Sequence, residues 1–198
     1  MERNDARARA LVTIRPIRPD DAPALERFYE RLSDDSRHLR FFAVTRGLSH
    51  AQSASFCSTD HDHRDGFVAT IAGVGDNGVD RVGAGAEPAG SGDRGEAENG
   101  ETIVGHVCLE PIAPGRAEVA IAVADALQGH GIGRRLMVAA FDWARWAGVD
   151  ALVATTLAEN VGIRRLMASL GVPLHERPIG VDAAAVELIV PPGHVVAA

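Results

Sequence analysis

Residues 118–135 of the chain, EVAIAVADALQGHGIGRR, contain the residue types from which a reactive site can be built. An apolar stretch leads into the turn Gln128–Gly129–His130–Gly131–Ile132–Gly133, and Arg134 continues into a helical pattern. The first backbone N–H groups of a helix lack partners and carry partial positive charge, and glycines let an anion approach them without a Cβ in the way. We therefore predict that the amides from Gln128 to Arg134 bind a pyrophosphate.

This glycine turn differs from the two best-known phosphate-binding motifs. The dinucleotide fingerprint places three glycines early in a strand–helix–strand unit, whereas here Gln128 takes the first position and the turn comes late. No Lys-Ser or Lys-Thr follows a glycine loop, as a Walker motif requires. A nucleotide-binding Rossmann module is also disfavoured by the antiparallel strands expected before the turn. A tight turn that serves packing alone remains an alternative.

Glu118 is the candidate proton acceptor. It lies in the apolar run AEVAIAV, where a buried carboxylate is out of place unless it is used or paired. Strand alternation puts it on the same face as Ala120 and Ala122, whose small side chains leave room for a substrate. The sequence thus predicts one buried carboxylate that takes a proton during a reaction. The alternative is a glutamate at a strand end that reaches solvent or Arg116.

Length and composition set limits on the class of protein. The 198 residues suit one domain, with 46% hydrophobic and 24% charged residues, and the net charge of −7 argues against a nucleic-acid scaffold. No apolar run approaches the roughly 20 residues of a membrane span. Two cysteines are too few for a disulfide framework, so a cytoplasmic location is expected, with neither nucleic acid nor membrane as a partner.

The chain is expected to be a single domain over residues 11–190 with tails at 1–10 and 191–198. Residues 73–101 hold nine of the 21 glycines and seven acidic residues, with no large apolar residue beyond three valines. Such a stretch cannot bury enough apolar surface to fix itself, so we predict a glycine-rich insertion there.

Periodicity and turn residues predict alternating strands and helices. Strands are expected at Leu11–Arg15, Gly66–Ala72, Thr102–Glu110, Arg116–Ala124, Asp150–Leu157, Val172–Pro178 and Ala184–Val190, with a turn at Pro111–Gly115. Helices are expected from Asp20 or Asp21 to Leu32, Ser33 to Phe42, Ser49 to Phe56, Gly131 to Trp146, and from Asn160 to just before Gly171. In the fourth helix, Ile132, Leu136, Ala139 and Trp143 share the face expected to be buried.

This order of elements, with Q-x-x-G-x-G opening a helix after an apolar strand, resembles the GNAT acyltransferase superfamily. The stretches TIRPIRPDD, LSDDSRHLRFF, AEVAIAVADALQGHGIGRRLM and EN-x-x-I-x-x-L-M-x-x-L-G-V resemble the catalytic domain of bacterial Pat-type protein lysine acetyltransferases. The resemblance covers about Leu11–Phe56 and Thr102–Val190. It implies an α/β (α+β) GNAT fold with a mixed, mostly antiparallel sheet of about seven strands flanked by helices.

The resemblance also implies an activity, the transfer of an acetyl group from acetyl-CoA to a primary amine, most readily the side chain of a protein lysine. It places the backbone of Ile121, Ala122 and Val123 along the pantetheine arm and gives Glu118 the role of general base. Asn160 would either hydrogen-bond that arm or cap the last helix. His130 and Arg134 would either add charge near the phosphates or face water.

One residue departs from the superfamily pattern. Many GNAT enzymes protonate the leaving thiolate with a tyrosine seven residues after the asparagine, but here that position is Met167, and Tyr29 is the sole tyrosine. A thiol with a pKa near ~8.5 is a tolerable leaving group without it. His38 and His106 are single histidines without visible partners and receive no role.

The sequence leaves other interpretations of the function open. Asp60–Asp65, DHDHRD, has ligand types that suit a metal, but no second cluster completes a site, so a solvated loop is favoured and no metal is expected. The same fold can acetylate a small-molecule amine, and a non-catalytic acyl-CoA-binding sensor would keep the loop but need no base.

Overall fold

A computed structural model describes residues 12–43, 45–74, 78, 79, 82, 100–171, 173, 175–179 and 185–191. The predicted N-terminal tail at 1–10, residues 192–198 of the predicted C-terminal tail and most of the predicted insertion at 73–101 lie outside these ranges.

The described chain forms one mixed sheet of seven strands in the order β1-β2-β3-β4-β5-β7-β6. The strands are β1 Val12–Pro16, β2 Asp65–Ala72, β3 Glu101–Ala113, β4 Arg116–Val123, β5 Ala151–Leu157, β6 His175–Ile179 and β7 Ala185–Val190. Neighbouring strands pair antiparallel except β4 and β5, which are parallel. The predicted mixed, mostly antiparallel sheet is thus confirmed.

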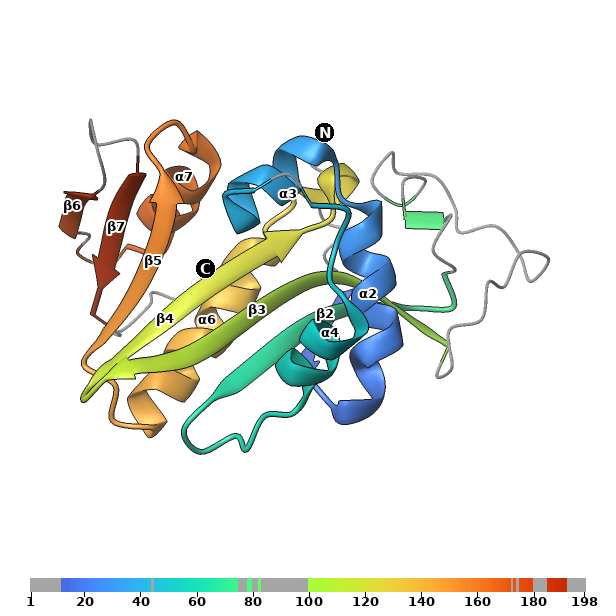
Figure 1. The fold of residues 1–198 in the computed structure, drawn as a ribbon, viewed down its shortest axis with the longest axis horizontal. Helices are drawn as coiled ribbons and strands as arrows, with labels where there is room; N and C mark the ends of the chain where they lie inside the picture. The colour runs from blue at the N-terminus through green and yellow to red at the C-terminus, as the bar shows by residue number, and fades with distance from the viewer. Residues whose placement is uncertain are drawn as a thin grey trace.

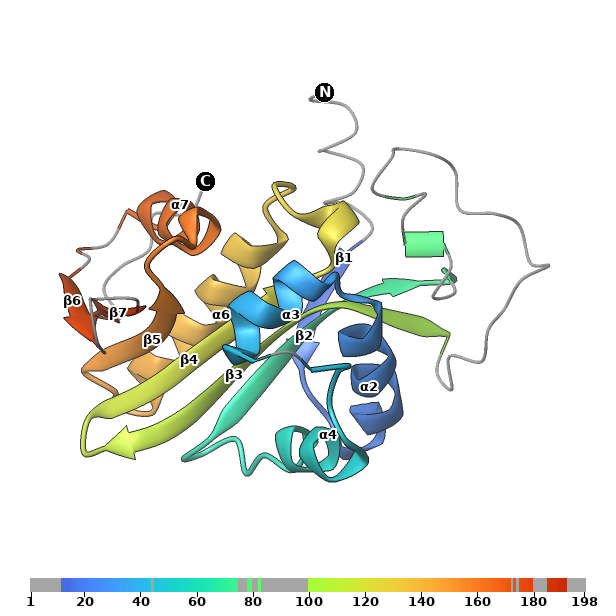
Figure 2. The same ribbon diagram turned by 45° about the horizontal axis from the view of Figure 1, so that its top comes forward.

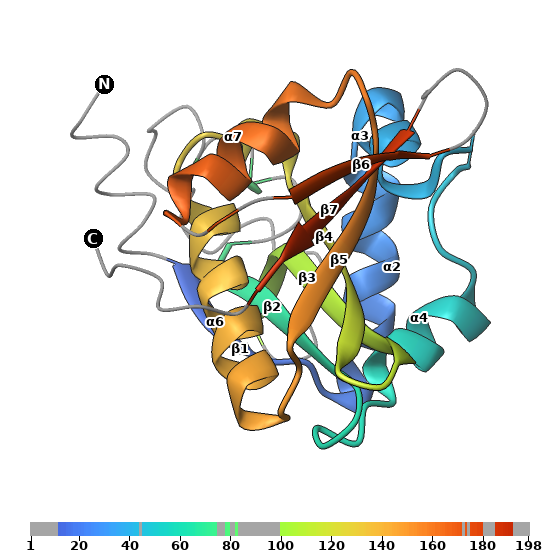
Figure 3. The same cartoon turned by 90° about the vertical axis from the view of Figure 1, so that its left-hand side faces the viewer.

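Helices cover both faces of the sheet (Figure 1). They are α2 Ala22–Arg31, α3 Asp34–Phe41, α4 His50–Cys57, α6 Ile132–Trp146 and α7 Val161–Ser169, with short 3-10 turns η1 Pro19–Asp21 and η3 Asp125–Leu127. Figure 3 shows α6 on one face of the sheet and α2 and α4 on the other. Helix α3 packs against β4 and β5, above the central strands in the view of Figure 2.

Local side chains fix where three of these helices begin. The Ser33 hydroxyl accepts the N–H of Ser36, and Ser49 forms a reciprocal capping box with Gln52. Asn160 accepts the N–H of Ile163 in the same way. Each cap satisfies a donor that a helix start leaves without a partner, so these boundaries could be read from the sequence.

The two faces of the sheet have different cores. On one face, α6 packs the fully buried Leu136, Met137 and Phe141 against Val107 and other apolar strand residues. On the other face, α2 and α4 pack Phe28, Tyr29 and Cys57 against Val68 and Ile103. The sheet is therefore a rigid layer whose central strands are covered on both sides.

The structure corrects two details of the predicted elements. Ala139 is only half-buried, whereas Met137, Ala140, Phe141 and Ala144 are buried, because α6 lies across β1 to β4 and so buries a wider face than one stripe. The turn expected at Pro111–Gly115 is shorter, since β3 continues to Ala113. A register shift between Pro111 and Ala113 accommodates the proline, which cannot donate to the ladder.

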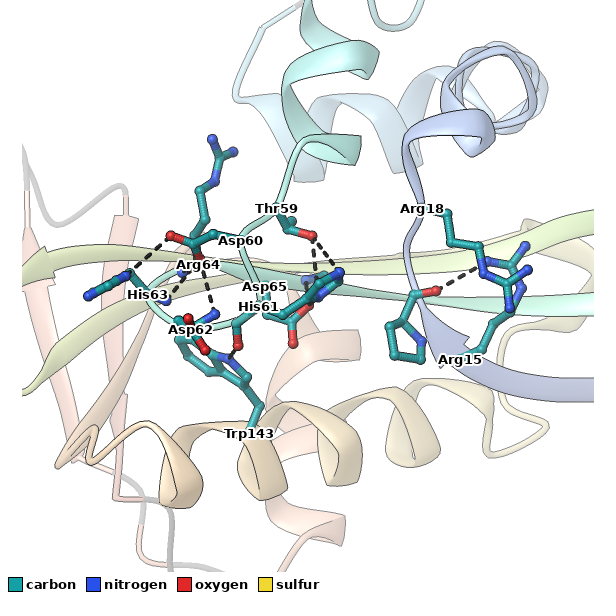
Figure 4. Close-up of polar contacts among 12 residues, drawn as sticks. Arg15, Arg18, Thr59, Asp60, His61, Asp62, His63, Arg64, Asp65 and Trp143 are labelled. Atoms are coloured by element: carbon teal, nitrogen blue, oxygen red, sulfur yellow. Dashed lines mark hydrogen bonds and ion pairs between the residues drawn. The ribbon is translucent and has the colours of Figure 1, made fainter.

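The acidic and histidine-rich loop between α4 and β2 is held by its own side chains (Figure 4). The Asp60 carboxylate accepts three backbone N–H groups, those of Asp62, His63 and Arg64. These bonds hold the pKa of Asp60 below its usual value. Trp143 of α6 donates its indole N–H to the His61 carbonyl, which ties the loop to the helix. Within the described ranges, no cluster of three or more His, Cys, Asp or Glu is placed to hold a metal.

Replacing Leu136 by Ala tests the α6 core. Leu136 is fully buried, so the change removes its packing and leaves a cavity against the sheet. We expect the free energy of unfolding to fall by about 2–5 kcal/mol, measured by urea denaturation. Trp146→Ala on the same helix is the control, because that side chain is 68% exposed and its loss should cost less than about 0.5 kcal/mol. Equal losses in both variants would contradict this account of the core.

Candidate active site

A groove of about 740 Å³ opens where β4 and β5 separate. The register between the two strands holds only from Arg116–Ala151 to Glu118–Val153, and beyond it they diverge (Figure 1). Helix α3, the turn before α6 and helix α7 form the rest of the wall. Among the described residues, the β5-facing side of β4 therefore has no strand partner beyond Glu118, which leaves polar backbone groups available to an extended ligand.

Ten of the twelve residues predicted from the sequence line this groove. They are Glu118, Ile121, Ala122, Val123, Gln128, Gly129, Gly131, Gly133, Arg134 and Asn160. The side chains of the other two, His130 and Ile132, do not line it. Ile132 is fully buried in the core, and the His130 ring hydrogen-bonds through Nδ1 to the Gln128 carbonyl at 2.9 Å. These two residues can therefore contribute only backbone groups to the groove in this arrangement.

The turn before α6 requires glycine at two positions. Gly129 and Gly131 have φ angles of 79° and 81°, in the left-handed region that residues with a Cβ rarely adopt. Gly131 is the N-cap of α6 and gives the helix no side-chain cap. No side-chain cap from Gly131 therefore occupies the backbone N–H groups in the first turn of α6. Helix starts with such N–H groups bind anions.

The turn is joined to α3 by a network centred on Asp125. This carboxylate accepts hydrogen bonds from the Ser33 amide and hydroxyl and from the Ser36 hydroxyl, at 2.9, 2.8 and 2.6 Å. Partial burial raises its pKa, but these bonds outweigh burial and hold the pKa of Asp125 below its usual value. The side-chain amide of Gln128 donates to the Ser36 hydroxyl and to the Val123 carbonyl, each at 3.2 Å. One wall of the groove is therefore fixed to the end of β4.

Glu118 lies on the wall of the groove, but its side chain is exposed. The expectation of a buried carboxylate was wrong, because the separation of β5 from β4 removes the cover that a central strand would normally have. Across the ladder it faces Glu110 of β3, which is engaged by Arg64 at 2.6 Å. In the described part of the chain no arginine forms an ion pair with Glu118. The alternative in which Glu118 pairs with Arg116 is therefore not observed.

Asn160 serves as the helix cap that the sequence analysis considered. Its Oδ1 accepts from Ile163, while its Nδ2 donates to the Thr156 hydroxyl at 3.0 Å. The side chain still lines the groove, so capping the helix and facing a ligand are compatible. Met167 also lines the groove, whereas the sole tyrosine, Tyr29, is fully buried outside it.

A buried polar cluster behind the groove was missed by the sequence analysis. Tyr29 of α2 is hydrogen-bonded to Nδ1 of His106 at 3.0 Å, and Arg40 of α3 donates to the Cys108 thiol at 3.3 Å. The sequence revealed no partner for His106, and the structure shows that Tyr29 is its partner. Strand alternation puts His106 and Cys108 on the same face as Glu110, but their partners come from distant helices, which no local pattern reveals.

Burial controls the ionisation of this cluster. It raises the pKa of Tyr29 to about 12 and also raises the pKa of the Cys108 thiol. Burial, assisted by the charge of Arg40, lowers the pKa of His106 to about 3. Tyr29, Cys108 and His106 are therefore neutral at physiological pH, while a guanidinium remains charged.

The chain is similar in sequence and in fold to known acetyltransferases. Residues 80–172 match the family model described as the acetyltransferase (GNAT) family. Acetyltransferase PA5475 of Pseudomonas aeruginosa is 29% identical over 160 residues, which cover 81% of this chain and 74% of that protein. The GNAT domain of PAT from S. lividans superposes with a TM-score of 0.69 at 27% identity, covering 90% of this chain and 89% of that one.

The chain is thus similar to the GNAT acetyltransferases, by the family model over residues 80–172 and by its fold. It is accordingly an acetyltransferase whose acyl donor is acetyl-CoA, as the resemblance implied. YncA of Salmonella typhimurium, solved with its cofactor acetyl-CoA, has the same fold, with a TM-score of 0.62 at 18% identity over 94% of this chain and 97% of that one. No helix in the described part of the acetyltransferase is both long and apolar enough to cross a membrane.

The buried His106 makes the stability of this acetyltransferase depend on pH. Its pKa is about 3 when folded against about 6.5 when unfolded, so the unfolded chain binds more protons between these values. Stability contributed by His106 is complete above pH 6.5 and is lost as pH falls, by up to about 2.5 kcal/mol near pH 4.5.

We expect His106→Gln to reduce the fall in the free energy of unfolding between pH 7 and 4.5, measured by denaturant titration at each pH. His175→Gln, at an exposed position of β6, corrects for the general effect of removing a histidine. An unchanged pH dependence in His106→Gln would show that His106 does not contribute.

Proposed function

We propose that this acetyltransferase transfers the acetyl group of acetyl-CoA to the side-chain amine of a protein lysine, with Glu118 as the general base. The observation that carries the proposal is the position of Glu118 at the point where β4 and β5 part, inside the same groove as the glycine turn. Val123 lies five residue steps along the strand from Glu118, about 17 Å at the usual rise. An extended ligand bound along β4 would thus reach from the turn to the carboxylate.

The glycine turn would hold the diphosphate of the donor. The amides of Gln128 to Arg134 surround the start of α6, where the helix dipole favours negative charge. The pantetheine arm carries amides of its own, and the β5-facing side of β4 at Ile121, Ala122 and Val123 could pair with it as a strand would. Asn160 faces the arm from the other wall.

The reaction needs an unprotonated amine, whereas a free lysine has a pKa near ~10.4. Glu118 would accept the proton, directly or through water, as the amine nitrogen attacks the thioester carbonyl. The carbon–nitrogen bond forms, the carbon–sulfur bond breaks, and the thiolate of CoA leaves. A strand amide of β4 near the carbonyl would stabilise the charge that develops on its oxygen.

Two observations favour a protein lysine as the acceptor. The chain is 27% identical to the GNAT domain of S. lividans PAT over nine-tenths of its length. Its motifs before and after α2 also resemble Pat-type lysine acetyltransferases. A free-thiol release assay with acetyl-CoA against lysine-containing proteins and small amines tests the choice. Because none of the 198 residues is lysine, every acetyl-lysine detected afterwards belongs to the acceptor.

Replacing Glu118 by Gln removes the base without changing its size. We expect kcat/KM to fall by about 10²–10⁴, with a near-normal Kd for acetyl-CoA, because the lost contribution is proton transfer. The matched control is Glu110→Gln, the neighbour across the ladder whose carboxylate binds Arg64, and it should keep turnover within about threefold. A wild-type protein that binds acetyl-CoA but turns over no acceptor would instead support the sensor alternative.

Replacing Gly129 by Ala tests the glycine turn. Gly129 lines the groove with φ 79°, and an added Cβ would meet no atom within 4 Å of the protein, so it would occupy space open to the donor. We expect Kd for acetyl-CoA to rise about tenfold, measured by calorimetry. Gly148→Ala is the matched control, with φ 68° and equally open surroundings at the other end of α6. Both should lose about 1 kcal/mol of stability, and equal Kd values would contradict the proposed role.

A further inference from the structure

Arg40 brings a fixed positive charge to the wall of the groove. It lies near the end of α3 and lines the groove together with Leu39 of the same helix and Phe42, the C-cap residue. Its guanidinium donates to the Cys108 thiol at 3.3 Å and lies 5.0 Å from the centre of the Phe41 ring and 6.0 Å from that of Phe56. The Tyr29 hydroxyl and the Glu118 carboxylate also act on it electrostatically.

The immediate partners of Arg40 do not neutralise it. The Cys108 thiol, the Tyr29 hydroxyl and the two aromatic rings position a guanidinium but carry no negative charge. The carboxylate that acts on Arg40 is Glu118, through space rather than by a direct ion pair. An arginine stays ionised under all ordinary conditions. When Glu118 takes up a proton during the reaction, the charge of Arg40 loses its counter-charge.

The position of Arg40 is fixed from both ends of its helix. At the start of α3, Ser33 and Ser36 are bonded to Asp125. At its end, Arg40 itself is bonded to Cys108. A cation held in this way loses little conformational entropy when it binds a ligand, and its planar fork matches a carboxylate better than a lysine would.

We propose that Arg40 is a specificity-determining residue that selects substrates with a carboxylate near the reacting centre. This inference rests on the proposed function, because it assumes that the transfer takes place beside Glu118. The carboxylate can come from two sources, the far end of the acyl chain of the donor or an acidic side chain next to the reacting lysine of the acceptor. Either one would pair with the guanidinium and restore the charge balance when Glu118 is protonated.

The test compares matched substrates in two arms. The donor arm measures kcat/KM for succinyl-CoA and for butyryl-CoA, whose acyl chains are similar in length but differ in charge. The acceptor arm uses acetyl-CoA with peptides in which the acceptor lysine is flanked by Glu or by Gln. We expect the carboxylate-bearing member to be favoured about 10- to 100-fold in one of the arms, as a charged hydrogen bond to arginine provides. Ratios close to one in both arms would overturn the proposal.

Variants then assign the preference to Arg40. Arg40→Met should bring the ratio in the responsive arm close to one, and Arg40→Lys, which keeps the charge but loses the fork, should give an intermediate ratio. Arg46→Met is the matched control, because it removes the same charge from an exposed position outside the groove, and it should keep the wild-type ratio. A ratio that survives in Arg40→Met, or in Arg40→Lys if the first variant does not fold, would overturn the assignment. Absence of thiol release with every substrate pair would contradict the proposed function instead.

Discussion

The site depends on the early end of the hydrogen-bonded pairing between β4 and β5. β4 and β5 pair over three residues each and then part, although both strands continue. A parallel pair in the middle of a sheet would normally be closed on both faces, so the gap exposes backbone groups that a protein otherwise satisfies. The sheet can keep this gap because antiparallel neighbours hold each strand on its other side, β3 against β4 and β7 against β5. The stability of the sheet and the opening of the groove therefore come from different pairs of strands.

Helix α3 turns this gap into a site with two distinct ends. Its first residues are bonded to the loop that leads into the glycine turn, and its last turn carries Arg40 toward the face of Glu118. The same short helix thus contacts the part of the groove suited to a diphosphate and the part suited to an incoming amine. A displacement of α3 would change both ends at once, which makes the Ser33–Asp125 bonds part of the geometry of the site.

The sequence was sufficient where short-range physics decides the outcome. The caps at Ser33, Ser49 and Asn160, the glycine turn at Gly129–Gly131 and the order of the elements depend on neighbours a few residues away. The exposure of Glu118 was not predictable, because it follows from where β5 leaves β4. The pairing of Tyr29 with His106 and the position of Arg40 join residues about 70 positions apart. Such contacts are set by how α2 and α3 pack on the sheet, which no local pattern encodes.

The two cysteines also bear on how turnover can be followed. Cys57 and Cys108 are both buried, and burial raises the pKa of Cys57 to about 12. The thiolate is the species that reacts with chromogenic disulfide reagents. When such a reagent is used to measure released CoA, the native protein therefore adds almost no absorbance from its own thiols. A chain that has lost its fold exposes both sulfur atoms and adds two equivalents per molecule. The same reagent therefore distinguishes turnover from denaturation, because turnover gives a growing signal and denaturation a fixed increment.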